Sequence, residues 1–161
     1  MAPGEPVSRV RVDELDEAQP LGRHLILVFR EFELEVLDAL HEAGYHDLTA
    51  ADLDILRFIK PGGSRAQDVA RLAGITKQGV AKAVSDLESR GYVRRRADAA
   101  DSRAKVIAFT RSGESLIGTA IDAIRRIEHR YQRIVGTRRV HELKRALRAL
   151  FHDHRERRAR S

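Results

Sequence analysis

The stretch from residue 76 to residue 87 combines small, amide and cationic side chains in a spacing that suits contact with a polyanion. In a helix, its inward side would carry Val80, Ala83, Val84 and Leu87, and its outward side Thr76, Lys77, Gln78, Ala81, Lys82 and Ser85. Glutamine can pair with adenine through two hydrogen bonds, and lysine reaches guanine acceptors or phosphates. Gly79 adds no side-chain bulk and allows close approach of the backbone. The stretch therefore has the chemistry of a helix that reads the major groove of DNA.

The residues before it have the spacing of a helix-turn-helix. Ala70 is followed by Gly74 four positions later and by Val80 six positions after that. Two short helices that cross at a sharp angle need a small residue where they approach, a glycine in the turn and an apolar residue that holds the second helix on the first. Two packed core helices would satisfy the same spacing, so the outward face of residues 76–85 is what favours nucleic acid.

A second cationic group follows, in a segment with the pattern of a β-hairpin. Its flanks contain Arg94, Arg95, Arg96, Arg103 and Lys105. Because Asp101 stands two positions before Arg103, we expect its carboxylate to hold the Arg103 guanidinium and orient it for the narrow, electronegative minor groove. A solvated surface ion pair is the alternative.

Charge is distributed unevenly along the 161 residues. Residues 1–59 carry five basic and thirteen acidic side chains, residues 60–111 carry twelve and five, and residues 112–161 carry thirteen and six. The net charge of +6 therefore includes a strongly basic centre. Such a centre favours a partner with phosphates, because lysine and arginine that neutralise phosphates release condensed counterions.

Several elements must position these residues. Apolar periodicity predicts four helices, over residues 21–43, 50–59, 65–73 and 77–90. The last three follow capping signals, which are Thr49 with Asp52, Ser64 with Gln67, and Thr76.

Two strand-like segments, residues 92–96 and 105–109, then flank a polar turn. Thr110 caps a long helix that Gly136 stops, and a last helix carries apolar residues to Phe151. The basic stretch from residue 152 to residue 161 is expected to fray.

The run from Ile75 to Arg95, with Asp101-Ser102-Arg103 and Thr110-Arg111-Ser112-Gly113, resembles the winged helix-turn-helix core of the MarR family of bacterial transcription regulators. The Leu-Glu-x-x-Gly-Tyr-Val exit from the recognition helix, the Asp-x-Arg wing and the Thr-x-x-Gly start of the next helix occur in the family's order and spacing. The motifs cover residues 49–113, and the resemblance spans about residues 20–152. Gly79 departs from the Thr, Ser or Ala common at that place, which leaves the base preference open.

The resemblance implies a mainly α chain of the α+β class. Its parts would be a flexible N-terminal segment (1–19), a helical dimerisation region (20–44 and 114–152), a winged helix-turn-helix region with a β-hairpin wing (48–113) and a basic tail (153–161). The flanking helices carry apolar stripes that one small lobe could not bury entirely, which also favours a homodimer.

The function implied is binding of double-stranded DNA at a pseudo-palindromic operator, as a cytoplasmic repressor. The resemblance assigns DNA contacts to Ser64, Arg65, Thr76, Gln78, Gly79, Lys82, Asp101 and Arg103. The outward face of the helix and the hairpin flanks add Lys77, Ser85, Arg95 and Lys105 as expected DNA contacts. The alternatives are an architectural protein with little sequence preference and no effector, and a winged helix used only for protein contacts.

Many family members respond to small lipophilic or phenolic effectors held between the helices and the lobe. Here such a cleft would draw on the first, second and fifth helices, near His24, Phe29 and Tyr45. A surface imidazole with no ligand is the alternative for His24.

Other functions find little support in the sequence. Without cysteine there is no disulfide, thiolate metal site or thiol-based switch. Hydrolase, metalloprotease, P-loop and dinucleotide motifs do not occur, so neither an enzyme nor a cofactor is expected. The histidine pairs 41/46 and 152/154 lack metal-ligand spacing. The longest apolar run, residues 25–29, is far short of the roughly 20 residues of a membrane span, and the N-terminus lacks a secretory core.

Overall fold

The computed structural model describes residues 19–98, 101 and 103–160, and the segment expected to be flexible, 1–19, lies outside them except for Gln19. The described residues form α1 (Leu21–Glu42), α2 (Ala50–Leu56), α3 (Ala66–Ala73), α4 (Lys77–Ser89), β1 (Val93–Ala97), β2 (Lys105–Phe109), α5 (Arg111–Val135) and α6 (Thr137–Arg160). This largely helical chain with one antiparallel hairpin confirms the predicted fold class.

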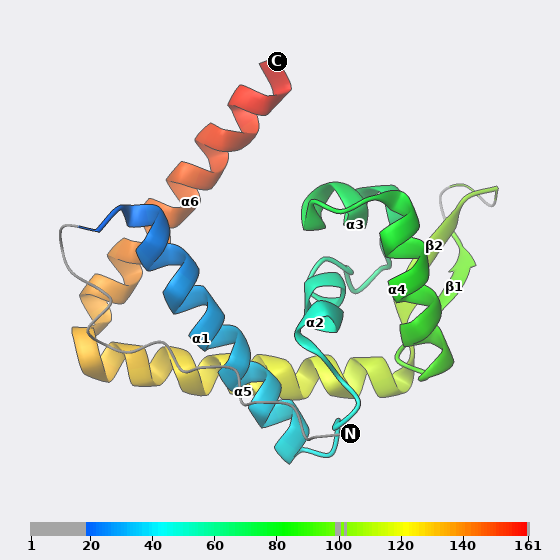
Figure 1. Cartoon of the computed structure of the whole chain (residues 1–161), viewed down its shortest axis with the longest axis horizontal. Coiled ribbons are helices and arrows are strands. Elements are labelled where there is room, and N and C mark those ends of the chain that lie inside the picture. Colours follow the sequence, from blue (N-terminus) through cyan, green and yellow to red (C-terminus); the bar gives the residue numbers. More distant parts are fainter. Residues whose placement is uncertain (1–18, 99–100, 102, 161) are drawn as a thin grey trace, which may run out of the picture.

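Helix α5 connects two arms that rise from its ends (Figure 1). One arm is a lobe of α2, α3, α4 and the β1–β2 hairpin, and the other is α6. The second half of α1 packs on α5, so the lobe is attached to the rest of the chain through two long helices.

Three threonines start helices as the sequence predicts. The hydroxyl of Thr49 accepts the amide of Asp52 while the Asp52 carboxylate accepts the amide of Thr49, which completes the capping box. Thr76 caps α4 through the amide of Gly79, and Thr110 caps α5 through the amide of Gly113.

The capping box predicted at Ser64 is wrong. Arg65 is the N-cap of α3 and makes no side-chain cap bond, while Ser64 is buried and forms an isolated β-bridge with Ile107 of β2. The Ser64 hydroxyl accepts the amide of Lys60 at 3.0 Å and donates to the carbonyl of Phe58 at 3.1 Å. Its side chain therefore closes the loop before α3, and the bridge adds residue 64 to the edge of the hairpin.

The start of α5 packs closely on the end of the lobe. Gly113 lies in the first turn, and a β-carbon there would overlap the main-chain carbonyl oxygen of Tyr92. The same carbonyl accepts the amide and the hydroxyl of Thr110. Glycine in the Thr-x-x-Gly motif is thus required by this approach of two backbones.

One apolar core joins the lobe to the two long helices. Its fully buried side chains include Leu40 of α1, Ile55 and Leu56 of α2, Leu87 of α4 and Leu116 of α5. The first half of α1 is different, because most of its apolar side chains are exposed in this single chain: Leu21, Leu25, Ile26, Val28 and Phe29.

Helix α6 continues to Arg160, past residue 152, where the sequence predicts the start of a fraying tail. No glycine or proline interrupts residues 137–160, and ion pairs one turn apart join Arg157 to Asp153 and Arg160 to Glu156. From residue 141 onward, every residue whose exposure is described lies exposed. Within the described ranges, no helix has both the length and the apolar character of a membrane span.

Candidate nucleic-acid interface

The two faces of α4 are divided as the sequence predicts. Val80, Val84 and Leu87 are buried beneath the helix. The opposite side is exposed and carries Thr76, Lys77, Gln78, Ala81, Lys82 and Ser85. The helix therefore presents amide, hydroxyl and ammonium groups outward, and it has no large apolar side chain on that face.

The first turn of α4 is closely packed around Gly79. The Thr76 hydroxyl lies 3.0 Å from the Gly79 amide, and a β-carbon at position 79 would lie 3.3 Å from the same oxygen. Any side chain at residue 79 would crowd the Thr76 hydroxyl that caps the helix. Glycine therefore leaves the first turn of α4 without side-chain bulk beside Lys77 and Gln78. The preceding turn reaches α4 through Gly74, whose φ of 70° is left-handed.

Arg95, predicted as a DNA contact, lies along α4 and bonds to it. Its guanidinium pairs with Glu88 and donates to the Ser85 hydroxyl at 3.1 Å and to the Ala81 carbonyl at 3.2 Å. Its amide also donates to the Glu88 carboxylate. Ser85 and Arg95 are therefore brought together, and in this structure they attach β1 to α4.

Arg65, predicted to face phosphate, is bonded to the wing. Its Nε and Nη2 atoms donate to one carboxylate oxygen of Asp98 at 3.0 and 2.7 Å, and Nη2 lies 3.9 Å from the Asp101 carboxylate. The hydrogen bond from Arg65 to Asp98 and the attraction between their charges raise the pKa of Arg65. With Ser64 buried, neither predicted contact at the start of α3 is a free phosphate ligand in this structure.

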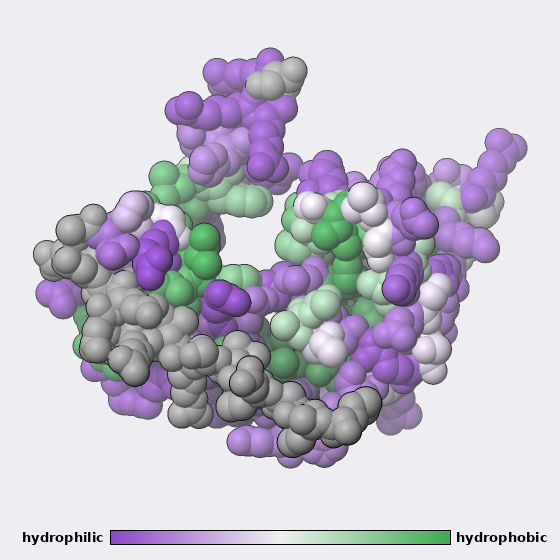
Figure 2. All heavy atoms as spheres, in the orientation of Figure 1, coloured by the Kyte–Doolittle hydropathy of each residue, from purple (hydrophilic) through white to green (hydrophobic). Residues whose placement is uncertain are grey.

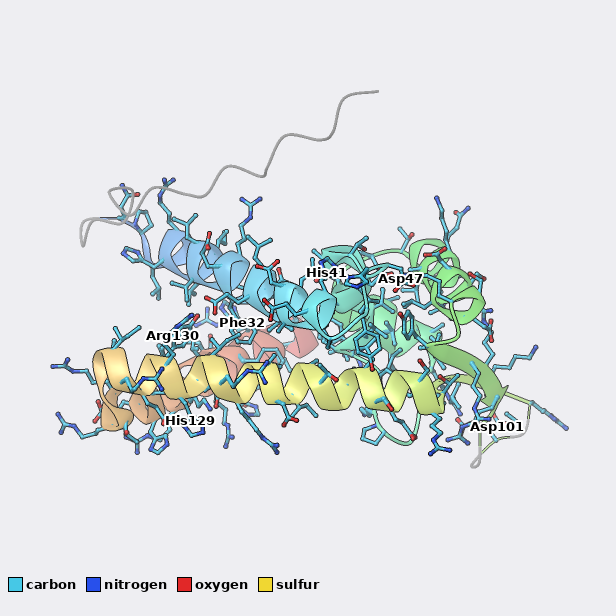
Figure 3. All side chains as sticks on the ribbon, turned by 90° about the horizontal axis from the view of Figure 1, so that it is seen from below. Phe32, His41, Asp47, Asp101, His129 and Arg130 are labelled. Carbon is cyan, nitrogen blue, oxygen red and sulfur yellow. The ribbon has the colours of Figure 1, made fainter. Side chains whose placement is uncertain are left out.

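The wing pair differs from the expectation. The Asp101 carboxylate accepts the main-chain amide of Arg103 at 3.1 Å instead of its guanidinium. Asp101 lies at the outer end of the hairpin (Figure 3). Across the described part of the chain, no acceptor bonds to the side chains of Arg94, Arg103 or Lys105, which are exposed. Arg94 is thus a further candidate contact, and its signal in the sequence was its place among three consecutive arginines.

Sequence reasoning missed a polar cluster behind the interface. Arg90, at the end of α4, donates to Asp52 at 2.6 Å and 3.2 Å, to Asp86 at 2.8 Å and to the Asp47 carbonyl at 2.8 Å. Burial alone would raise the pKa of Asp52, but the hydrogen bonds from Arg90 and Thr49 outweigh it and lower that pKa.

Tyr92, the residue before β1, also belongs to this cluster. Its hydroxyl donates to Asp47 at 2.6 Å, and burial together with this bond raises the pKa of Tyr92 to about 12. Asp47 and His41 lie where α1 passes into the lobe (Figure 3). The cluster therefore ties the α1–α2 connection to the end of the recognition helix.

An apolar cavity of about 690 Å³ lies between α1, α2 and α5. Its walls include Phe32, Val36, Leu53, Leu56, Leu116, Ala120 and Ile124, and its polar lining comes from Glu33, Arg57 and Glu114. Arg57 pairs with Glu33 and lies 5.1 Å from the centre of the Phe29 ring.

The residues predicted for an effector cleft do not line this cavity. Phe29 lies beside it beneath Arg57, Tyr45 packs near Tyr92 with ring centres 6.1 Å apart, and His24 is near the start of α1, with Nδ1 3.3 Å from the Pro20 carbonyl oxygen. Within the described ranges, no group of three or more His, Asp or Glu side chains is arranged to hold a metal ion.

Comparisons with known proteins agree with this arrangement. Residues 46–104 match the model of the MarR family. The transcriptional regulator Tm0710 from Thermotoga maritima is 27% identical, with a TM-score of 0.56 over 86% of this chain and 96% of that one. The structure of MarR is 22% identical, with a TM-score of 0.75 over 92% and 99%.

A third similar structure contains a bound small molecule. CouR from Rhodococcus jostii RHA1, bound to p-coumaroyl-CoA, is 24% identical, with a TM-score of 0.60 over 83% of this chain and 95% of that one. A search of curated protein sequences finds no match.

Proposed function

We propose that this chain, which belongs to the MarR family of winged-helix proteins, is a sequence-specific DNA-binding transcription regulator that acts as a homodimer. In this proposal α4 enters the major groove, where Gln78 and Lys82 contact bases or phosphates, and Arg103 of the wing enters the adjacent minor groove. Binding at a pseudo-palindromic operator represses transcription, because the dimer occupies the promoter.

One observation carries the proposal. The outward face of α4 and the wing present a group of exposed cations that bond no carboxylate among the described residues: Lys77, Lys82, Arg94, Arg103 and Lys105. Cations held on rigid elements and left without partners suit the phosphates of a duplex. Gln78 at the start of α4 adds a group that can distinguish bases.

Exposed apolar side chains support the homodimer. On α6 they form one stripe, Leu143, Leu147, Leu150 and Phe151, and α1 carries a second group in its first half. Figure 2 shows hydrophobic side chains gathered on this arm of the molecule. Patches of this kind mark surfaces that another protein covers, and a second copy would bring the same stripes together.

Substitution of the α6 stripe tests the dimer. Leu147→Glu places a charge in the stripe, whereas Ala149→Glu places the same charge on the opposite side of α6. We expect light scattering to give a dimer for the wild type and for Ala149→Glu, and a monomer for Leu147→Glu. A wild-type monomer at micromolar concentration would contradict this part of the proposal.

The cavity supports a small-molecule effector. Its volume of about 690 Å³ lies in the usual range for ligand pockets, and Arg57 and Glu33 add charged groups to an otherwise apolar lining. We propose that a lipophilic or phenolic molecule binds there and weakens DNA binding. This feature favours a regulated protein over an architectural one.

Competition binding tests the function as a whole. A labelled duplex from the protein's own upstream region is bound, and unlabelled duplex of the same or of random sequence is added. We expect only the specific duplex to displace the probe efficiently, and protection of two half-sites about one helical turn of 10 base pairs apart. Equal displacement by random duplex would favour the architectural alternative.

A further inference from the structure

We infer that Arg65 is a positioning residue, which holds the wing in place through Asp98 so that Arg103 is presented to the minor groove. The inference rests on the proposed DNA binding, and it gives Arg65 a role different from the phosphate contact expected from the sequence.

The geometry of the bridge joins two separate parts of the lobe. Arg65 is the N-cap residue of α3, and Asp98 follows the last residue of β1, 33 positions later in the chain. Both donor atoms of Arg65 meet the same Asp98 oxygen, at 2.7 and 3.0 Å, and the Asp98 side chain is 19% exposed. A charge-assisted bond in this partly buried place is stronger than an ordinary surface ion pair.

The bridge acts on the end of the hairpin that carries Arg103. The Asp98 amide donates to the Ala104 carbonyl, and the Ala104 amide donates to the Asp101 carbonyl. The amide of Arg103 donates to the Asp101 carboxylate, which itself lies 3.9 Å from Arg65. The backbone around Arg103 is therefore connected through Asp98 and Asp101 to the start of α3.

The rest of the hairpin has other attachments. Ser64 is bridged to Ile107, Arg95 bonds to α4, and Arg96 donates to the Gly62 carbonyl at 2.7 Å. These contacts hold β1 and the middle of β2. Arg65, by contrast, bonds to Asp98 and lies near Asp101, both beyond Ala97, so loss of its bridge should act mainly on the end of the wing.

The direction in which one substitution changes DNA affinity separates a positioning role of Arg65 from a direct contact with DNA. Asp98→Asn removes a negative charge beside the DNA-binding face, and on electrostatic grounds alone it should strengthen binding to a polyanion. If the bridge positions the wing, the same substitution should weaken DNA binding by about tenfold. The reason is that the conformational entropy lost on ordering the wing then opposes binding. Asp68→Asn on α3 is the matched control, since it removes a negative charge that acts on Arg65 through space and pairs with Arg71 but bonds neither Arg65 nor the wing.

A thermodynamic cycle completes the experiment. Affinity for the upstream duplex is measured for Arg65→Gln, Asp98→Asn and the double variant, each also combined with Arg103→Ala. We expect Arg65→Gln and Asp98→Asn to lose similar amounts of DNA affinity, and the double variant to bind no more weakly than either. In the Arg103→Ala background, none of the three variants should lower the affinity further. Tighter binding by Asp98→Asn, or losses that persist without Arg103, would overturn the inference.

Amide hydrogen exchange of the free protein provides an independent measurement. The protection of the amides at position 98 and at Ala104, relative to their intrinsic exchange rates, should fall in Asp98→Asn and remain unchanged in Asp68→Asn. Unchanged exchange in Asp98→Asn would overturn the inference and leave the proposed function intact. A wild-type protein that binds no duplex would overturn the proposed function and the role of Arg65 in it, while exchange still decides whether the bridge holds the wing.

Discussion

Arg90 and Asp52 join the end of the recognition helix to the start of α2, with Nη2 of Arg90 2.6 Å from Oδ1 of Asp52. The Asp52 side chain is only 9% exposed, and it also closes the capping box of α2. Three residues of α2 or its C-cap, Leu53, Leu56 and Arg57, line the apolar cavity. One helix therefore contacts both the cavity and the recognition helix.

Acid should weaken this connection. The pKa of Asp52 is lowered in the folded protein, so its stabilising contribution is complete above the unfolded value of about 3.9 and is lost as pH falls through the folded value. We expect Asp52→Asn to cost about 1–3 kcal/mol at pH 7 and less at pH 3, measured by urea unfolding at one fixed protein concentration.

Asp54→Asn is the control for this comparison. Asp54 is exposed and pairs with Arg57 at 3.3 Å, so its replacement should change the free energy of unfolding by less than about 1 kcal/mol at either pH. A cost for Asp52→Asn that is the same at pH 3 and pH 7 would contradict the role assigned to its charge.

Arg103→Ala should weaken DNA binding substantially and leave the fold unchanged. The Arg103 side chain is exposed and bonds no acceptor among the described residues, so its removal disturbs no contact within the protein. Fluorescence anisotropy with the upstream duplex measures the affinity, and thermal unfolding checks the fold. Unchanged affinity would exclude the minor-groove role of this residue.

Gln78→Ala should cost about 1–3 kcal/mol of binding free energy on the specific duplex and little on random duplex. Gln78 is exposed in the first turn of α4, where a side chain can reach base edges. Parallel titrations with the two duplexes measure the difference. An equal loss on both would mean that Gln78 contacts the DNA backbone.

Gly113→Ala should destabilise the protein by about 1–3 kcal/mol or more, because the added carbon meets the Tyr92 carbonyl, which cannot move aside like a flexible side chain. Gly118→Ala, in the same helix with open space around it, should stabilise the protein by about 0.5–1 kcal/mol. Urea unfolding of both variants measures the contrast, and equal effects would contradict the close approach.

Local features of the fold could be predicted from the sequence. The caps at Thr49, Thr76 and Thr110 were predictable because each involves residues three positions apart. The buried and exposed faces of α4 follow from helical periodicity in the same way.

Contacts between distant residues could not be predicted from these local patterns. Ser64 has the sequence of a cap, yet its main-chain bridge to Ile107 and its burial give it another role. Arg65 and Asp98, or Arg90 and Asp52, lie more than 30 positions apart, and no local pattern joins them. Helical periodicity alone also does not distinguish Phe32 of α1, which lines the cavity, from Phe29, which lies beside it.

The unbroken helix α5 has the length and position of a lever between the two arms. Its 25 residues correspond to a rod of roughly 37 Å at 1.5 Å per residue. A tilt of only about 5° at the α6 end would therefore displace the Gly113 end by roughly 3 Å, close to the spacing of adjacent base pairs. With Gly113 packed on the Tyr92 backbone, the lobe must follow that displacement. A small rotation at the far arm would thus move α4 by about the height of one base step.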